Sequence, residues 1–563
     1  VGISLTDRAG EAWYIPTMAP PGEPTLPIGA IVASLGELLR DDSITKLGHN
    51  LKYDLKVLAR AGLTVRGPLF DTMIAEWVLN PDAPLGLKNQ AWTRLGIKMT
   101  EIEALIGQGK GQSTMDTVPL AKVVPYACAD ADMTMRLAEM LEPELRDREQ
   151  YDLFRDLEMP LLPVLVDMEL AGIELDVAWL GELSNELSAR LSSLESSIYQ
   201  QAGEQFNINS TQQLSEILFE RLSLPTQGAR KTKSGHYSTR ADVLESLRGV
   251  HPIVDDLLTY RELTKLKSTY VDTLPTLVNP TTGRVHTTYN PAGTVTGRIS
   301  SNNPNLQNIP IRTDEGRRIR RAFVAQEGHL LMGADYSQVE LRVMAHMSKD
   351  GGLLDAFARG EDIHATTAAA VYGVALSDVT YAMRNIAKAV NFGLIYGQGA
   401  FGLARQIGVP VDQAQSFIDR YFERFPGVRA YMDQVQNEAA AQGYVETLLR
   451  RRRYFPELAG GSGLGRDRQT SARMAINTPI QGSAADIIKL AMIRMHRMLA
   501  QTRVATRMLL QVHDEVVLEV PEREVDVAEH LVREAMEDAF ELLVPLKVDV
   551  EVGPNWLDME KRN

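Results

Sequence analysis

The sequence predicts a multidomain protein of the α/β class, and three observations support this prediction. The chain has 563 residues, too many for a single hydrophobic core, so roughly three to five domains are expected. Short apolar runs bounded by turn residues are interleaved with long stretches of helical period, which predicts both strands and helices. Hydrophobic residues make up 44% and charged residues 23% of the chain, a composition typical of folded domains.

The composition also limits the possible classes of function. Cys128 is the only cysteine, which excludes an intramolecular disulfide and suits a reducing compartment. No apolar run reaches the roughly 18 residues of a membrane helix, and no charged and then apolar leader opens the chain, so we expect no membrane partner. Because Val1 lies inside an expected strand, we expect the chain to be a fragment of a longer protein.

The net charge of −14 does not exclude a nucleic-acid partner, because affinity for phosphate depends on local patches rather than on the sum. Two segments, 312–321 and 450–473, are rich in arginine. A charge run is more often a solvated face than a binding site. These segments therefore permit a polyanionic partner without establishing one.

The first part of the chain is predicted to be an α/β unit, and the next part to be helical. Residues 1 to about 150 begin with a hairpin whose strands are Val1–Leu5 and Ala12–Ile15. Between Leu180 and Ile198, apolar residues recur every three or four positions, which predicts a helix with one core-facing side. A further helix is expected from His251 to about Leu274.

Two acidic clusters lie in the N-terminal unit. Asn50 and Asp54 precede an amphipathic helix, and Tyr126 and Asp130 are four residues apart. The second pair therefore shares one helix face, where a phenol and a metal-bound carboxylate could address the same water. Taken alone, each cluster is better explained by helix capping and surface charge.

The stretch from Leu330 to Arg342 predicts a strand followed at once by a helix. Leu330 to Met332 form an apolar run, and helical spacing begins after Asp335. Ser337 and Glu340 fit the S-x-x-E capping box that starts such a helix. An ionised Asp at a strand end suits a hard cation such as Mg²⁺. The alternative is a turn Asp followed by a capping Glu.

A second constellation lies on one predicted helix. Arg384, Lys388, Phe392 and Tyr396 are each four residues apart, so they share one slowly drifting helix face. Two cations followed by two aromatics suit a nucleoside triphosphate laid along the helix. The alternative is an amphipathic helix with a mixed face.

Asp514 supports the triphosphate interpretation. It lies between two predicted strands, at His513–Asp514, and so shares the strand-end geometry of Asp335. Two such carboxylates could hold two metal ions about 4 Å apart. The amide-rich segment 294–310 in turn indicates an interface with a polar partner, because buried amides need hydrogen-bond partners.

Three stretches resemble motifs A, B and C of family A DNA polymerases, in the same order: Asp335–Arg342, Arg384–Gly397 and Val512–Glu515. The likeness extends from Val1 to the C-terminus and is closest to the large fragment of bacterial members. It implies a right-hand polymerase with an N-terminal RNase H-like 3′-5′ exonuclease domain. The implied parts are the exonuclease-like domain at 1–150, a thumb and the start of the polymerase domain at 151–294, a palm from 295–345 and 485–563, and fingers at 346–484.

The resemblance also implies roles for single residues. Asp335, Asp514 and the carbonyl of Tyr336 would bind two Mg²⁺ ions, with Mn²⁺ as a substitute, and Lys388 would protonate the leaving pyrophosphate. The expected dNTP contacts are Arg384, Lys388, Phe392, Tyr396, His364, Gln338 and Glu340, of which Glu340 resembles a steric gate against a ribose 2′-hydroxyl. The expected DNA contacts are Arg298, Asn305, Gln307, Arg473, Asn477, Gln481 and His513, largely to minor-groove acceptors that differ little among base pairs.

The N-terminal unit resembles a proofreading exonuclease incompletely. Asn50 and Asp54 match its second motif, and Tyr126 and Asp130 match its third. The first motif, an Asp-x-Glu on the first strand, is not in the sequence, and Asp7 and Glu11 are poor substitutes. We therefore expect little or no proofreading by this chain. The 5′-nuclease domain of many full-length relatives is also expected to be absent.

The expected function is primer-dependent, template-directed DNA synthesis in replication or repair, with dNTPs and primer-template DNA as partners. The resemblance implies a monomer in a bacterial cytoplasm or an organelle. Two alternatives remain: an RNA polymerase on the same palm, and a non-catalytic clamp that binds primer and template. Glu340 argues against the first, and the intact Asp335, Asp514, Arg384 and Lys388 argue against the second.

Overall fold

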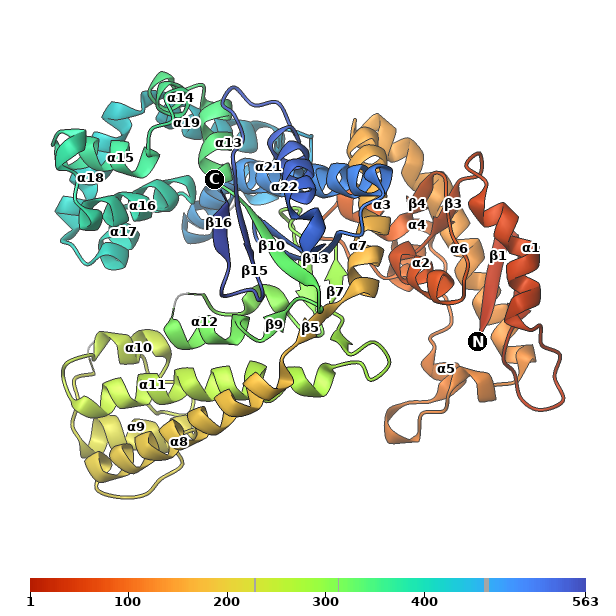
Figure 1. Cartoon of the computed structure of the whole chain (residues 1–563), viewed down its shortest axis with the longest axis horizontal. Coiled ribbons are helices and arrows are strands. Elements are labelled where there is room, and N and C mark those ends of the chain that lie inside the picture. Colours follow the sequence, from red (N-terminus) through yellow and green to blue (C-terminus); the bar gives the residue numbers. More distant parts are fainter. Residues whose placement is uncertain (227–228, 312, 460–464, 563) are drawn as a thin grey trace.

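The computed structural model describes residues 1–226, 229–311, 313–459 and 465–562, without the side chains of 465–467. Arg312 and the side chain of Arg466, both in the arginine-rich segments, lie outside this description. A central sheet with its helices forms the body of the molecule (Figure 1). A helical lobe and a long helical arm extend from one side of this body, and an N-terminal lobe lies on the other.

The central sheet has five antiparallel strands, ordered β13-β14-β10-β15-β16. Neighbouring residues of its middle strand face two different cores, because side chains alternate along a strand. Met332 and Ala334 join the largest hydrophobic cluster, whereas Leu331 joins the cluster next to the arm. The apolar run at Leu330 is thus a central strand, as predicted. The strands are β10 (His329–Tyr336), β13 (Arg507–Val512), β14 (Glu515–Pro521), β15 (Val548–Gly553) and β16 (Glu560–Arg562).

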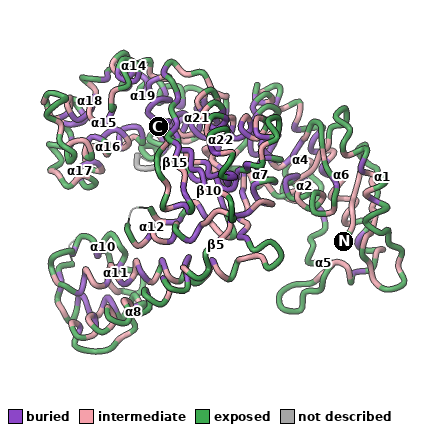
Figure 2. The backbone as a smooth tube through the Cα atoms, viewed as in Figure 1, coloured by how far each residue is buried: buried purple, intermediate pink, exposed green. Residues whose placement is uncertain are grey.

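Two helices pack against this sheet, and a third helix packs against both of them. They are α7 (Met159–Ala171), α21 (Gly465–Thr502) and α22 (Val525–Glu537). α21 packs along α22, and α7 packs against β13. Buried residues are concentrated around this junction, whereas the lobes are more exposed (Figure 2).

The arm is built on two long helices that pack together, α8 (Val177–Ala202) and α11 (Pro252–Leu266). The leucine stripe predicted for the first of them is core: Leu180, Leu183 and Leu187 are buried. The predicted second helix continues past α11 as a π-helical turn, Lys267–Val271. Two short helices, α9 (Thr211–Ser215) and α10 (Ala241–Ser246), also belong to the arm.

The helical lobe follows the strand that carries Asp335. Its helices are α13 (Val339–Ser348), α14 (Gly351–Ala358), α15 (Ile363–Tyr372), α16 (Tyr381–Ile395), α17 (Ala400–Ile407), α18 (Val411–Arg424) and α19 (Pro426–Gln442). A two-stranded hairpin, β11 (Tyr444–Glu446) and β12 (Arg452–Tyr454), then leads towards α21.

The N-terminal lobe contains the predicted hairpin, β1 (Gly2–Arg8) and β2 (Glu11–Pro16). A long helix, α6 (Leu120–Asp147), packs against both of its strands. The lobe also contains a parallel pair, β3 (Lys46–Gly48) and β4 (Leu69–Asp71), and the helices α1 (Ile28–Arg40), α2 (Leu51–Arg60), α3 (Thr72–Leu79), α4 (Leu87–Leu95) and α5 (Glu103–Ile106). Across the described ranges, no helix combines the length and apolar character needed to cross a membrane.

Candidate active site

Asp335 and Asp514 lie at the same end of two neighbouring strands. The register of β10 and β14 places Asp335 opposite Glu515. Asp514 lies in the two-residue turn between β13 and β14, where His513 has a φ of 56°. The backbone N–H of Tyr336 donates to the carbonyl oxygen of Asp514 over 3.2 Å. The fold thus brings together two carboxylates that are far apart in the sequence.

Burial raises the pKa of both carboxylates of this site, and neighbouring carboxylates add to the rise at Asp335. Partial burial, together with the charges of Glu515 and Asp514, raises the pKa of Asp335 to about 7. Burial also raises the pKa of Asp514, against the opposing effect of Arg298. Glu515 has partners of its own, because it accepts a hydrogen bond from Trp556 Nε1 over 3.1 Å and lies 3.8 Å from Arg320.

The residues at this strand end fit a divalent cation. Because the pKa values of the two carboxylates are raised, ionising them costs free energy, and a nearby cation would remove that cost. Carboxylate oxygens are also the ligands that Mg²⁺ prefers. Within the described ranges, no group of three or more His, Cys, Asp or Glu side chains is arranged around a common metal position. Asp335 and Asp514 are thus a pair of candidate ligands rather than a complete site.

An ionic cluster around the buried Glu340 lies beside the carboxylate pair. Glu340 on α13 accepts hydrogen bonds from Arg298 over 2.8 Å and from the hydroxyl of Tyr396 over 2.7 Å. Burial raises the pKa of Glu340, although both partners oppose that rise. The cluster connects the loop before the strand β8 (Ser300–Asn302), the helix after β10 and the end of α16. Each oxygen of Glu340 therefore already has one donor.

The predicted capping box is wrong. α13 starts after Gln338, whose φ of 58° is in the left-handed region, and no side chain caps the helix. The N–H of Ser337 donates instead to the carbonyl of Lys547 on the approach to β15. Ser337 is thus still part of the sheet edge, and Glu340 is one position too early in the helix to complete a box. Its carboxylate contacts Arg298 and Tyr396 rather than its own backbone.

The predicted helix face of four residues is present in the structure. Arg384, Lys388 and Phe392 are in α16, and Tyr396 follows its last residue. Arg384 Nε lies 2.5 Å from Asp362 Oδ2. Lys388 is exposed and makes no ion pair with any residue that the structure describes. The ring centroids of Phe392 and Tyr396 are 6.3 Å apart.

His364 on α15 is held neutral against this face. Burial and the charges of Arg384 and Lys388 lower its pKa to about 4, which Asp362 only partly offsets. Its ring centroid lies 5.8 Å from that of Phe392. The amide of Asn391 and Nδ1 of His364 are 3.1 Å apart, which fixes the orientation of the ring.

A pocket of about 270 Å³ connects the strand end to this helix. Gln338, Arg342, Arg384 and Lys547 line it together with the acidic residue Asp362. Sequence reasoning missed the role of Asp362, which caps α15 and pairs with Arg384. An Asp just before an Ala-rich helical run is a capping signal that could have found it.

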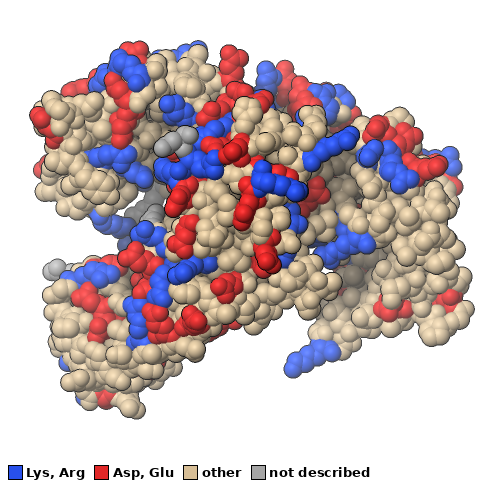
Figure 3. Space-filling model, viewed as in Figure 1, with Lys and Arg blue, Asp and Glu red and all other residues tan. Residues whose placement is uncertain are grey.

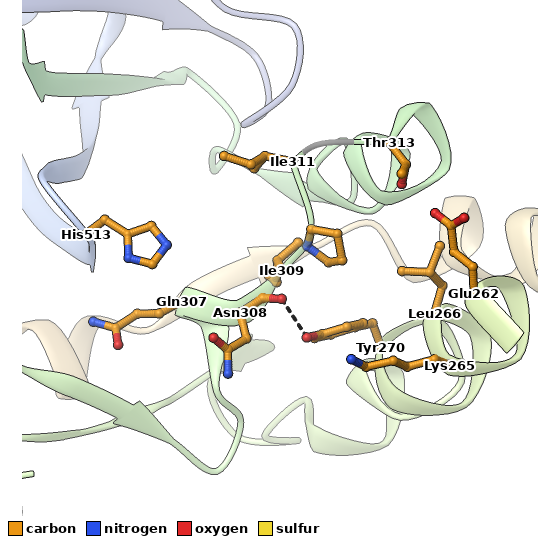
Figure 4. Close-up of a pocket in the computed structure, with 11 residues that line it drawn as sticks. Glu262, Lys265, Leu266, Tyr270, Gln307, Asn308, Ile309, Ile311, Thr313 and His513 are labelled. Atoms are coloured by element: carbon orange, nitrogen blue, oxygen red, sulfur yellow. Dashed lines mark hydrogen bonds between the residues drawn. The ribbon is translucent and has the colours of Figure 1, made fainter. Parts of the chain in front are cut away.

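Apart from Arg298, which pairs with Glu340, the expected DNA contacts gather at two places. Gln307 and His513 line a pocket of about 370 Å³ where the arm meets the sheet, and Tyr270 donates there to the carbonyl of Asn308 over 2.7 Å (Figure 4). Asn305 caps the turn beside it and binds the N–H of Gln307. Gln307 itself donates to Ile299 and Gln511, so its amide is already engaged within the protein.

The other expected DNA contacts lie on α21. Arg473, Asn477 and Gln481 are spaced four apart along this helix. Arg473 is exposed and adjoins Gly397, where an added Cβ would meet its backbone at 3.1 Å. Oδ1 of Asn477 is buried without a hydrogen-bond partner among the described residues. In Figure 3, the molecule is hollowed between the helical lobe and the arm, and Lys and Arg side chains gather along this hollow.

The arginine-rich segments are mostly occupied by internal ion pairs. Arg450 pairs with Glu149, Arg452 lies 2.6 Å from Glu446, and Arg451 is buried. Arginines that are close together in the sequence therefore do not form one basic surface in this structure. In the other segment, Arg317, Arg318, Arg320 and Arg321 each have an acidic partner.

The N-terminal lobe holds the four other predicted residues in two separate pairs. Asn50, at a φ of 59°, precedes α2, which carries Asp54. Asp71, which sequence reasoning missed, accepts N–H bonds from Asn50 and Leu51 and also caps α3. Burial and the charge of Asp71 raise the pKa of Asp54 to about 6.

The second pair lies on α6 beside a lysine. Lys88 Nζ lies 3.5 Å from the hydroxyl of Tyr126 and 5.0 Å from its ring centroid. Burial raises the pKa of Asp130 to about 6, against the effect of Lys88. Within the described residues, no hydrogen bond or ion pair joins this pair to Asn50 or Asp54.

Comparison with known proteins gives a consistent result. A family model described as DNA polymerase family A matches residues 177–558, and one described as 3′-5′ exonuclease matches residues 2–146. The DNA polymerase I of Chloroflexus aurantiacus is 49% identical over 99% of this chain and 59% of that protein. The DNA polymerase I of Pseudomonas aeruginosa is 46% identical over 99% of this chain and 61% of that protein. The chain thus spans about six tenths of the length of these relatives.

A solved structure supports the same relationship. The POL domain of Pol1 from M. smegmatis, in complex with DNA primer-template and dNTP, superposes with a TM-score of 0.87 at 39% identity. The match covers 97% of this chain and 91% of that one.

Proposed function

Because this chain belongs to DNA polymerase family A, with an N-terminal 3′-5′ exonuclease domain ahead of the polymerase domain, we propose that it extends a DNA primer on a template with deoxynucleoside triphosphates. The family and fold class expected from the three motifs are thereby confirmed. The observation that carries the proposal is the placement of Asp335 and Asp514 at adjacent strand ends, joined by the Tyr336 hydrogen bond.

The hand-like parts are assigned in the same proposal. The arm and the segment before it (151–294) would be the thumb, and the helical lobe and the start of α21 (346–484) would be the fingers. The palm would consist of 295–345 and 485–563, which contain the central sheet. The hollow between lobe and arm would then receive primer and template (Figure 3).

Asp335, Asp514 and the carbonyl of Tyr336 would hold two Mg²⁺ ions, or Mn²⁺ in their place. When bound, such ions favour ionisation of an attacking hydroxyl and neutralise phosphate charge. The protein's part is to present two carboxylates on rigid strands, and Arg298 limits the rise in the pKa of Asp514.

Arg384, Lys388 and His364 would bind the triphosphate. In this structure Arg384 is paired with Asp362, so an incoming triphosphate competes with that carboxylate. Lys388 has no such competitor among the described residues and is placed to donate a proton to the leaving pyrophosphate. His364 is neutral near pH 7 because its pKa is low, so it would serve as a hydrogen-bonding group rather than as a third cation.

Glu340, Phe392, Tyr396 and Gln338 would surround the sugar and base. Glu340 is held on both oxygens, so it cannot turn away from a ribose 2′-hydroxyl without breaking one of these bonds. A rigid gate of this kind favours deoxynucleotides. Arg298, Asn305, Gln307, Arg473, Asn477, Gln481 and His513 would contact primer and template.

We also propose that this chain has little or no proofreading activity. Two-metal hydrolysis needs several carboxylates around one site. Here the ammonium of Lys88 lies beside Tyr126 and partly offsets the rise that burial causes in the pKa of Asp130, so a lysine of the protein itself already lies beside the Tyr126–Asp130 pair. A 3′-mismatched fluorescent primer should keep its length with this chain in Mg²⁺, and shortening of that primer would refute this part of the proposal.

Primer extension on a defined template, with each nucleotide set in turn, tests the main proposal. The expected result is extension in Mg²⁺ with dNTPs and much less with rNTPs, by a monomer as measured by light scattering. Extension with rNTPs alone would identify an RNA polymerase instead. Primer-template binding without any extension would identify a non-catalytic clamp.

A further inference from the structure

Trp77 joins the N-terminal lobe to the body of the molecule. It lies on α3, is 2% exposed, and its indole Nε1–H donates to the carbonyl oxygen of Thr294 over 3.0 Å. Thr294 belongs to the loop that precedes the strand β8 (Ser300–Asn302), more than two hundred positions further along the chain. A buried indole usually finds one partner for its N–H, and this one finds it on the loop that leads to the candidate active site.

The ring of Trp77 packs against two buried cations of the body. Arg451 lies over the ring at 4.8 Å, and Lys489 lies over it at 5.1 Å. Both cations are fixed by carboxylates: Lys489 Nζ lies 2.8 Å from Glu158 Oε1, and Arg451 Nη2 lies 2.6 Å from Asp486 Oδ1. The ring is therefore held by groups that cannot move independently.

The loop from Thr294 to Arg298 is tied to the same groups. Gly297 has a φ of 86°, and a Cβ there would lie 2.5 Å from Arg451 Nε, so only glycine lets the loop approach the guanidinium so closely. The hydroxyl of Thr294 donates to the carbonyl of Arg298 over 2.9 Å. This bond closes the loop between Arg298 and Thr294, the residue that Trp77 binds.

Arg298 then contacts the candidate active site directly. Its Nη2 lies 2.8 Å from Glu340 Oε1, the carboxylate that Tyr396 also binds. An unbroken series of hydrogen bonds therefore runs from Trp77 through Thr294 and Arg298 to Glu340.

We propose that Trp77 is a positioning residue for the polymerase site: by binding the Thr294 carbonyl, it sets the loop from which Arg298 orients Glu340. The N-terminal lobe thereby contributes to nucleotide selection without any nuclease chemistry. The inference rests on the proposed polymerase function and adds to it a residue outside the polymerase domain.

The test compares Trp77→Phe with the wild-type chain in single-nucleotide incorporation. Phenylalanine keeps an aromatic ring beside Arg451 and Lys489 but lacks the N–H. The KM for dNTP should rise, and the preference for dNTP over rNTP should fall, each about two- to tenfold, the range expected for one hydrogen bond, while kcat changes less. Trp92→Phe is the matched control, because Trp92 lies in the same lobe and is 61% exposed; it should change neither quantity.

Making the same Trp77→Phe change in an Arg298→Ala chain separates a positioning role of Trp77 from general destabilisation. In Arg298→Ala, the further change Trp77→Phe should alter neither KM nor the sugar preference, because the route between them is already broken. The inference is overturned if Trp77→Phe leaves both quantities unchanged in the wild-type background, or changes them equally in the Arg298→Ala background. A wild-type chain that extends no primer would overturn the proposed function instead, before any variant is compared.

Discussion

The backbone N–H of Tyr336 donates to the carbonyl oxygen of Asp514 over 3.2 Å, at the end where Asp335 faces Glu515. This bond keeps the turn that carries Asp514 against the strand that carries Asp335. The two carboxylates are therefore held by backbone geometry rather than by their own side-chain contacts.

Replacing either carboxylate by its amide should abolish primer extension with little change in the fold. Asp335→Asn and Asp514→Asn should each lower the single-turnover rate by roughly a thousandfold or more, because a preorganised charged group at the reacting phosphate is removed. Asp412→Asn, which changes an exposed carboxylate in the first turn of α18, is the control. Near-normal extension by either site variant would exclude these residues as metal ligands.

The contribution of Asp335 to stability should fall as pH rises towards neutrality. Its pKa of about 7 lies above the usual value of 3.8, so between these values the folded state holds a proton that the unfolded state has lost. The contribution of this group to stability is therefore full below about pH 4 and is lost as pH rises to about 7. Asp335→Asn, which cannot ionise, should unfold at a higher temperature than the wild-type chain at pH 8 and at nearly the same temperature at pH 4.

Mg²⁺ provides the control for that experiment. A cation bound by the ionised pair stabilises the folded state by mass action, so millimolar Mg²⁺ should raise the melting temperature of the wild-type chain at pH 8 and not that of Asp335→Asn. The assignment of the pKa would be contradicted by a difference between the two melting temperatures that stays constant from pH 4 to pH 8.

Removing the Glu340 carboxylate should relax the discrimination between sugars. Glu340→Ala should raise rNTP incorporation relative to dNTP, because the group that would crowd a 2′-hydroxyl is gone. It should also reduce the efficiency with dNTP, because Arg298 and the hydroxyl of Tyr396 lose their shared acceptor. The measurement is kcat/KM for each nucleotide.

Tyr396→Phe is the matched variant for Glu340. It removes one of the two bonds and leaves the carboxylate in place, so the sugar preference should be largely kept. Glu340 would have no role as a gate if its removal lowered kcat/KM for dNTP and rNTP by the same factor.

Local patterns predicted the elements of the site but not the contacts between them. The change from an apolar run to helical spacing predicted the strand and the helix around Asp335. The spacing of four residues predicted that Arg384, Lys388 and Phe392 share one helix face. The capping box failed because the N–H of Ser337 is still used by the sheet edge. Nothing in the local sequence indicates that the two oxygens of Glu340 bind Arg298 and Tyr396, because both contacts are tertiary.

The arginine-rich segment 450–473 is a second case in which the local sequence did not predict the tertiary contacts. The sequence offers Arg451 as one member of a basic run, yet the folded chain buries it between Glu158 and Asp486. Its partners come from α21 and from the segment before α7. A run of like charges in sequence carries no information on acidic residues that the fold brings to it.

The buried network around Arg451 should contribute strongly to stability. Lys489 and Glu158 are both 0% exposed, and removing one member of a buried pair leaves the other charge poorly compensated, at a cost of about 3 to 5 kcal/mol. Lys489→Met should therefore lower the free energy of unfolding by about that amount, measured by urea unfolding. Arg494→Met breaks a half-exposed pair with Glu534 and should cost about 1 kcal/mol or less.

The double variant tests whether the cost arises from the unpaired charge. With Lys489→Met and Glu158→Gln together, Arg451 and Asp486 remain as a neutral pair, so the loss should be smaller than the sum of the two single losses. Strictly additive losses would show that Lys489 and Glu158 act independently. Because Trp77 packs on Lys489 and Arg451, Lys489→Met should also raise the KM for dNTP if the loop at Thr294 depends on that packing.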